Sequence, residues 1–252
     1  MRHVNQGIHL FGYLPHGQDH DRETEKKIFR YSLIIPCLFL CGFWLVFLTG
    51  ILLDQEFTVW GIYPLRLKGL RGLLFSPFIH GSLKHLTANS VPFLILSFCL
   101  FYFYRSLAYR IFVLLYVLSG LGVWLAAREA WHIGASGLIY GLGSFLFFSG
   151  IFRNDVRLLT IALVVVFLYG GMFWGIFLTE ASVSWESHLW GAVSGLLLGA
   201  IYRRQGPQRI PFAWESEEEE EHEADSIEAN SIIDHEATNK NREHCKKKPE
   251  DS

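Results

Sequence analysis

The chain has 252 residues, of which 51% are hydrophobic and 15% aromatic, and its formal net charge is −2. The length suffices for one large domain, and the near-neutral charge, without a single basic patch, argues against a nucleic-acid partner. The 4 cysteines form neither a CxxC pair nor a Cys/His zinc spacing. We therefore interpret them as small buried hydrophobes and one thiol in the polar tail.

Long apolar runs separated by charged residues follow a polar segment, 1–30. About 20 apolar residues form a helix that crosses a bilayer. We therefore predict an all-α polytopic membrane domain over 31–204. The first run is too long for the core of a signal peptide, so no cleavable signal is expected. The six predicted spans are 31–53, 85–104, 109–127, 136–152, 158–178 and 187–203.

Lysines and arginines near the span ends predict the orientation. They precede the first span, lie between spans two and three and between spans four and five, and follow span six. This side, with both termini, is predicted to be cytoplasmic. The loop 54–84 opposes the rule through Arg66, Lys68, Arg71 and Lys84. Its mixture of basic, aromatic and leucine residues is typical of a segment in the membrane interface.

The second span opens with two hydrogen-bond donors, His85 and Asn89, which lie four residues apart and so share one helix face. With the backbone N–H of Ser136 they could form an oxyanion hole. Zinc is the competing interpretation of His80, His85 and His188. No HExxH motif and no acidic ligand on the span accompany them, so we expect no metal. We expect His80 to hold the preceding loop through a hydrogen bond.

The fourth span is short, because Gly137 to Phe152 would form a helix of roughly 24 Å against a hydrocarbon core of about 30 Å. Ser136, at its start, would therefore lie below the outer membrane plane. The free N–H groups and dipole of a helix N-terminus stabilise a negative oxygen there. Tyr140 lies on the same face as Ser136 and could stack on His188. The alternative is a tyrosine that only packs at the interface.

Glycines recur every four residues in spans four and six. Small residues at this spacing let two helix backbones approach closely in lipid. Such an approach would bring His188 within hydrogen-bond reach of Ser136, and a histidine is the simplest base that activates a serine. Gly134 and Gly137 would leave room for a substrate carbonyl. The repeated glycines are Gly137 and Gly141 in span four, and Gly191, Gly195 and Gly199 in span six.

Two questions stay open at this point. Ser136 alone is compatible with a helix cap, and His188 alone with a buried polar residue. Catalysis is favoured only because both residues open their spans at the same membrane face and so lie at a similar depth. A third triad member is also unassigned. Glu186 is two residues before His188 and would point away on a helix, which leaves a Ser–His dyad as the favoured arrangement. The acids that loops could supply are Asp54, Glu56, Glu129 and Glu180.

The residues after Arg204 have a different composition. The run "ESEEEEEHEADSIEANS" is strongly acidic and almost free of apolar residues. Such a segment cannot bury enough surface to fold. We predict a disordered cytoplasmic tail over 205–252.

Three motifs, "HGSLKHLTAN", "GASGLIYG" and "HLWGAVSG", resemble the rhomboid family of intramembrane serine proteases, in that family's order, and the resemblance covers about 31–204. It implies Ser136 as nucleophile, His188 as base, and His85, Asn89 and the Ser136 amide as the oxyanion hole. It also implies the basic six-span form common in prokaryotes, in a bacterial plasma membrane, and no cofactor.

The resemblance further implies that single-span membrane proteins are the substrates and enter sideways from lipid near span five, with the first loop partly in the outer leaflet. The alternative is a catalytically silent rhomboid-like chaperone or adaptor that binds transmembrane helices, which would need neither Ser136 nor His188. A channel or transporter would need polar residues along the whole depth, and spans one, three and five supply almost none.

Overall fold

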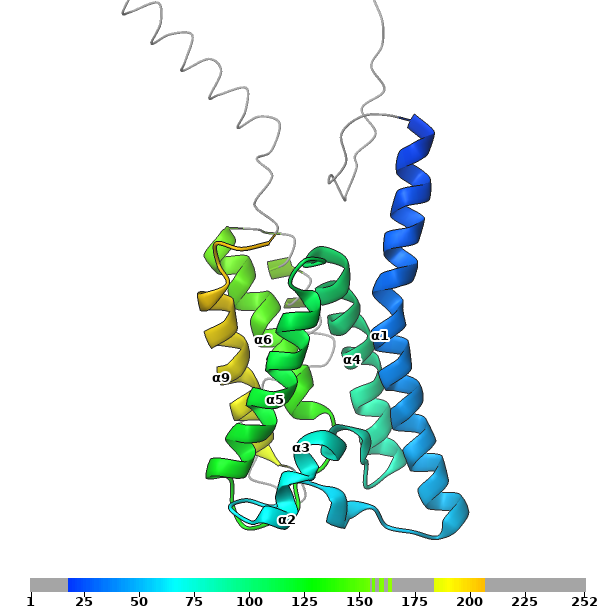
Figure 1. The fold of residues 1–252 in the computed structure, drawn as a ribbon, viewed down its shortest axis with the longest axis vertical. Helices are drawn as coiled ribbons and strands as arrows, with labels where there is room; N and C mark the ends of the chain where they lie inside the picture. The colour runs from blue at the N-terminus through cyan, green and yellow to red at the C-terminus, as the bar shows by residue number, and fades with distance from the viewer. Residues whose placement is uncertain (1–17, 155, 157–158, 161–162, 165–183, 207–252) are drawn as a thin grey trace, which may run out of the picture. The chain divides into compact units, whose positions relative to one another are not determined.

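The computed structural model describes residues 18–154, 156, 159–160, 163–164 and 184–206. The predicted acidic tail beyond residue 206 and all but four residues of the predicted fifth span lie outside this part. Within it the chain is helical, apart from loops and one isolated β-bridge (Figure 1).

Five long helices occupy the described part. They are α1 (Gln18–Leu53), α4 (Leu83–Phe103), α5 (Ala108–Ala126), α6 (Ser136–Arg153) and α9 (Trp185–Ile201). Of these, α1, α4, α5 and α6 are long and apolar enough to cross a membrane. All five agree within a few residues with predicted spans, except at the start of α1.

Helix α1 begins at Gln18, well before the apolar run that predicts it. Hydropathy marks only the apolar part of a helix, whereas good helix formers such as Glu, Lys and Arg extend it in water. An exposed ion pair joins Glu23 to Lys26 at 2.8 Å, one turn apart on this extension. The helix therefore continues through part of the segment that composition assigns to the polar N-terminus.

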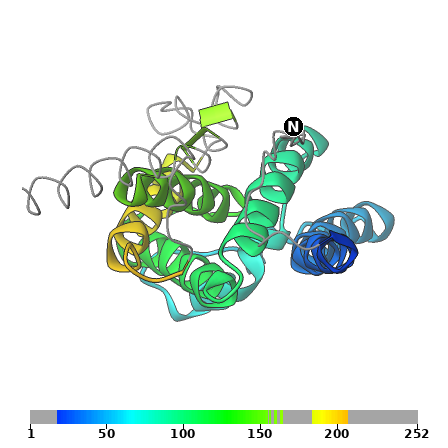
Figure 2. The same cartoon turned by 90° about the horizontal axis from the view of Figure 1, so that it is seen from above.

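The helices form a bundle in which α1 stands at one edge and packs mainly on α4 (Figure 2). Aromatic rings fill the α1–α4 contact. Phe43 and Phe93 are fully buried, with ring centroids 4.9 Å apart, and Phe39 lies 5.0 Å from Phe112 of α5. Edge-to-face pairs of this kind add attraction beyond the area that they bury. Much of the remaining α1 surface is apolar and exposed, as lipid contact requires.

The loop between α1 and α4 folds into four short helices, η1 (Thr58–Trp60), α2 (Leu67–Leu70), α3 (Gly72–Phe75) and η2 (Ser76–Phe78). Its basic side chains lie over aromatic faces. Lys68 Nζ is 5.2 Å from the Tyr63 ring and 5.4 Å from the Trp131 ring, and the Arg71 guanidinium is 4.6 Å from the Trp60 ring. Cation–π contact stabilises these charges locally, so the neighbouring aromatic rings accommodate the basic residues of this loop.

This loop also fixes the segment that leads into α6. Ile62 and His132 exchange two backbone hydrogen bonds, of 2.9 and 2.8 Å, in the isolated antiparallel bridge. The N–H of Gly134 donates to the carbonyl of Ser76 at 2.8 Å. The backbone just before Ser136 is therefore fixed by hydrogen bonds to the loop between α1 and α4, and not only by α6 and α9.

Helices α6 and α9 share the most extensive contact among the described helices. At the C-terminal end of α6, the Arg153 side chain is buried and donates to Ser149 Oγ at 2.9 Å and to the carbonyl of Tyr202 at 2.7 Å. Its guanidinium also lies 5.3 Å from the Tyr104 ring, whose hydroxyl donates to Ser149 at 2.8 Å. The arginine thus ties the ends of both helices to α4 and satisfies carbonyls at the end of α9.

Candidate active site

Ser136 is the first residue of α6 and is half-buried. Two residues earlier, Gly134 has a φ of 100°, a conformation that favours glycine. A Cβ at this position would lie 2.7 Å from the Nε2 and Cε1 atoms of His85 and 3.7 Å from Asn89 Nδ2. Glycine is therefore needed twice here, for the backbone turn and for the approach of His85. The approach places both predicted donors beside the backbone that leads to Ser136.

The N-terminal turns of α4 present these two donors. Ser82 caps the helix by accepting from the N–H of His85 at 3.1 Å. Asn89 follows one turn later, is only 6% exposed, and donates from Nδ2 to the carbonyl of His85 at 3.1 Å. An amide nitrogen carries two hydrogens, so this contact orients the Asn89 amide and uses one of them.

His188 and Tyr140 meet across the α6–α9 contact. Their rings are stacked with centroids 4.1 Å apart and an interplanar angle of 6°. Both side chains are buried. Stacking restricts the imidazole to one plane, at the end of α9 that lies beside the start of α6.

The two rows of glycines face each other. A Cβ on Gly191 would overlap the carbonyl oxygen of Gly137, and one on Gly195 would overlap that of Gly141. A Cβ on Gly137 would lie 3.2 Å from the carbonyl oxygen of Ser187. The helix backbones are therefore in direct contact along this line, and larger side chains have no room. Because Gly137 follows Ser136 and Ser187 precedes His188, the two candidate residues lie in the first turns of neighbouring helices.

His80 makes no side-chain hydrogen bond of normal geometry among the described residues, and its one polar interaction is with the nearby backbone of Phe78. The side chain is buried. Its ring packs instead against Phe43 at 5.3 Å and His85 at 5.0 Å. Burial, aided by the nearby His85, lowers the pKa of His80 to about 3. A neutral imidazole packed among rings thus replaces the predicted loop-fixing contact.

The described loop acids that could supply a third catalytic member do not contact Ser136 or His188 in any hydrogen bond or ion pair of the described residues. Asp54 and Glu56 line a cavity of about 270 Å³ together with His80, at the C-terminal end of α1. Glu129 is exposed. Glu180 lies outside the described residues.

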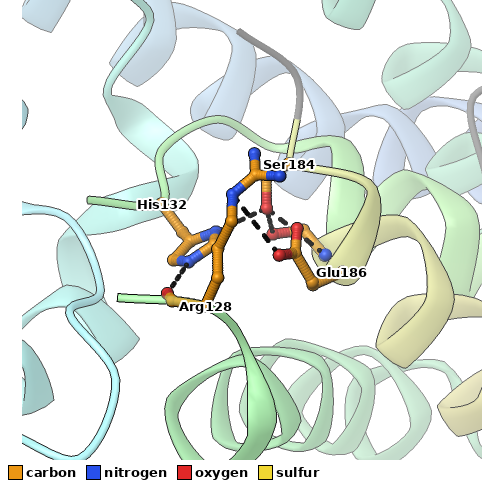
Figure 3. A network of polar contacts seen from close by, with 5 residues as sticks. Arg128, His132, Ser184 and Glu186 are labelled. Atoms are coloured by element: carbon orange, nitrogen blue, oxygen red, sulfur yellow. Dashed lines mark hydrogen bonds and ion pairs between the residues drawn. The ribbon is translucent and has the colours of Figure 1, made fainter. Parts of the chain in front are cut away.

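A polar cluster that the sequence patterns do not reveal joins the segment before α6 to the start of α9 (Figure 3). It consists of Arg128, His132, Ser184, Glu186 and Ser187. His132 Nδ1 is 2.6 Å from Ser184 Oγ, and Arg128 Nε is 3.5 Å from Glu186 Oε1. Glu186 thus pairs with Arg128. This agrees with the helical spacing, by which the Glu186 side chain points away from His188. No periodic sequence pattern predicts this polar cluster, because its members come from loops and from the first turn of a helix.

The described part of the chain is a bundle of apolar helices, and it defines an integral membrane protein. The chain belongs to the rhomboid family, since the family model described as the Rhomboid domain matches residues 68–205, more than half of its length. A protein of Mycobacterium tuberculosis, described as uncharacterised, is 37% identical over 180 residues, which cover 68% of this chain and 74% of the relative. An uncharacterised protein of Mycobacterium leprae is 32% identical over 212 residues, covering 79% and 80%.

Proposed function

We propose that the protein is an intramembrane serine endopeptidase that cleaves single-span membrane proteins through a Ser136–His188 dyad. One observation carries the proposal. Ser136 starts α6, two donor side chains lie beside Gly134 in the segment that precedes it, and a histidine stacked on Tyr140 lies in the first turn of the neighbouring helix, α9. Membership of the rhomboid family, whose members are generally serine proteases of this kind, supports it.

In the proposed reaction, His188 accepts the proton of Ser136 Oγ as the oxygen attacks the scissile carbonyl. The negative oxygen that forms is held by His85, Asn89 and the backbone N–H of Ser136. Free N–H groups and the positive dipole end of α6 add to this stabilisation. Proton return from His188 releases the amine product, and water then hydrolyses the acyl-enzyme by the same route.

Substrates of this site are membrane proteins that reach it from the bilayer. We propose that residues 31–204 form the protease domain, with both termini cytoplasmic and the active site open to the opposite side. The basic residues near the predicted span ends support this orientation. The mycobacterial relatives support a bacterial plasma membrane.

The purified protein in detergent tests the proposal. We expect it to cleave a generic single-span substrate, and a fluorophosphonate probe to label Ser136, located by peptide mapping. Labelling at Ser184 or Ser187 instead would reassign the nucleophile. Binding of transmembrane helices with neither cleavage nor labelling would favour the chaperone or adaptor alternative.

The Asn89→Ala protein should retain measurable cleavage at a reduced rate. Loss of one oxyanion donor typically costs about 10²–10³ in kcat, and two proposed donors remain here. The mutant also loses the Asn89 contact with the His85 carbonyl at 3.1 Å, but both residues lie within α4, whose backbone should keep His85 in place. Steady-state kinetics check the effect. Unchanged kcat would reduce the role of Asn89 to packing.

A further inference from the structure

We infer that the polar cluster of Arg128, His132, Ser184, Glu186 and Ser187 is a positioning device that sets the first turn of α9, and with it His188, against the segment that leads to Ser136. The inference rests on the proposed function for its catalytic consequence. The contacts themselves are independent of it.

The polar cluster joins two segments, each adjacent to one member of the proposed dyad. His132 lies four residues before Ser136, between α5 and α6. Ser184 is the N-cap of α9, and its oxygen accepts from the N–H of Ser187 at 3.4 Å. His188 follows Ser187 directly. A displacement of either half therefore changes the separation of the two catalytic side chains.

Hydrogen-bond chemistry allows only one assignment of donors and acceptors along the chain His132–Ser184–Ser187. His132 Nε2 is 3.0 Å from the carbonyl of Arg128, which only accepts, so Nε2 must carry the proton. In the neutral ring Nδ1 then accepts from the Ser184 hydroxyl at 2.6 Å. Ser184 Oγ in turn accepts from the Ser187 hydroxyl at 2.7 Å. These hydrogen bonds hold the Ser184 side chain, whose Oγ caps α9, in one rotamer.

His132 is well placed to transmit position, because it is fixed at both backbone and side chain. Its N–H and carbonyl pair with Ile62, and a Cβ on Gly61 would lie 2.6 Å from its carbonyl oxygen. The side chain is 2% exposed. Burial is the main cause that lowers the pKa of His132, which favours the neutral ring that the hydrogen-bond order needs. Through this residue the loop after α1 is connected to the cap of α9.

Arg128 and Glu186 hold the same two segments by charge. Glu186 is 4% exposed, and its carboxylate lies in the first turn of α9, where the helix dipole favours a negative group. Its Oε1 is 3.5 Å from Arg128 Nε, while Oε2 has no hydrogen-bond partner among the described residues. Loss of the arginine would leave a buried charge without its counter-ion, which is strongly unfavourable.

The His132–Ser184 pair is not a second catalytic dyad. Both ring nitrogens of His132 are engaged, and the ring is closed off from solvent. The Ser184 oxygen is committed to capping α9. These residues act on the proposed reaction only through the placement of His188, so they are positioning residues.

Kinetics per active site test the inference. We expect His132→Phe, which keeps an aromatic ring but removes both ring nitrogens, and Ser184→Ala to lower kcat by about 10- to 100-fold, since a shift of about 1 Å can cost that much. KM should stay within about twofold, because substrate contacts are unchanged. Ser184→Thr, which keeps the hydroxyl, should restore most of the loss. The matched control is Ser194→Ala, which removes another partly buried hydroxyl of α9, one that donates to the Trp190 carbonyl at 2.7 Å.

Active-site titration with a fluorophosphonate separates positioning from folding, because kcat is then counted per labelled Ser136. Wild-type kcat per labelled site in His132→Phe and Ser184→Ala would overturn the inference, even if total activity fell. Hydrogen exchange at residues 185–190 should also accelerate in both variants. This readout needs no protease activity. If exchange accelerates in both variants but the wild-type protein never cleaves, the proposed function alone is rejected. Exchange in the variants that equals the wild-type rate would reject the positioning role.

Discussion

Replacing Ser136 by alanine should reduce cleavage of a single-span substrate to the detection limit. The change removes one oxygen and adds no bulk. Loss of a nucleophilic serine costs on the order of 10⁶ in kcat in a soluble serine protease. In the proposed mechanism no other group can form the acyl-enzyme, so the loss here should be of that size. A gel-based cleavage assay with a fluorophosphonate label on the same samples measures both consequences.

The fold should survive this substitution. The N-cap residue of α6 is Ala135, which makes no side-chain capping bond, so Ser136 is not the residue that caps the helix. Alanine is also the best helix former. The melting temperature should therefore stay close to that of the wild type. Cleavage by the Ser136→Ala protein at the wild-type rate would show that another residue is the nucleophile.

Hydropathy and small-residue spacing predict much of the described structure. The apolar runs locate α4, α5, α6 and α9 closely, because a bilayer demands long apolar helices whatever their neighbours. The four-residue glycine spacing predicts which face of α9 meets α6, and the same spacing brings Tyr140 toward His188. Each of these rules acts along a single helix, so one sequence suffices to apply it.

Contacts between loops and helix ends could not be predicted in this way. His132 and Ser184 are 52 positions apart and belong to no periodic pattern. Arg153 illustrates the same limit. Charge correctly marks the end of α6 there, yet the side chain is buried against the carbonyl of Tyr202 at 2.7 Å. Only the folded chain shows that such a charge ties two helices together instead of facing water.

Replacing Gly195 by valine should lower activity by about 100-fold or more, although the residue carries no chemistry. A Cβ at this position would overlap the carbonyl oxygen of Gly141 and lie 2.7 Å from both Phe145 N and Ser144 Cβ. The first two atoms belong to the α6 backbone, which cannot move aside without moving Ser136. A shift of about 1 Å between catalytic groups can cost on the order of 10²-fold in rate. Overpacking should also lower the free energy of unfolding by about 1–3 kcal/mol.

Two matched controls separate this contact from general effects of substitution. Gly143→Ala adds a Cβ to α6 whose nearest neighbour would be Leu96 Cδ1 at 3.6 Å, an ordinary contact, so activity should stay near the wild-type value and the helix should gain stability. Leu197 of α9 is 52% exposed and points away from α6, so Leu197→Val should be nearly silent. The measurements are kcat per labelled Ser136 and thermal unfolding for all three variants. Full activity in Gly195→Val would mean that the glycine rows are not what holds Ser136 and His188 in register.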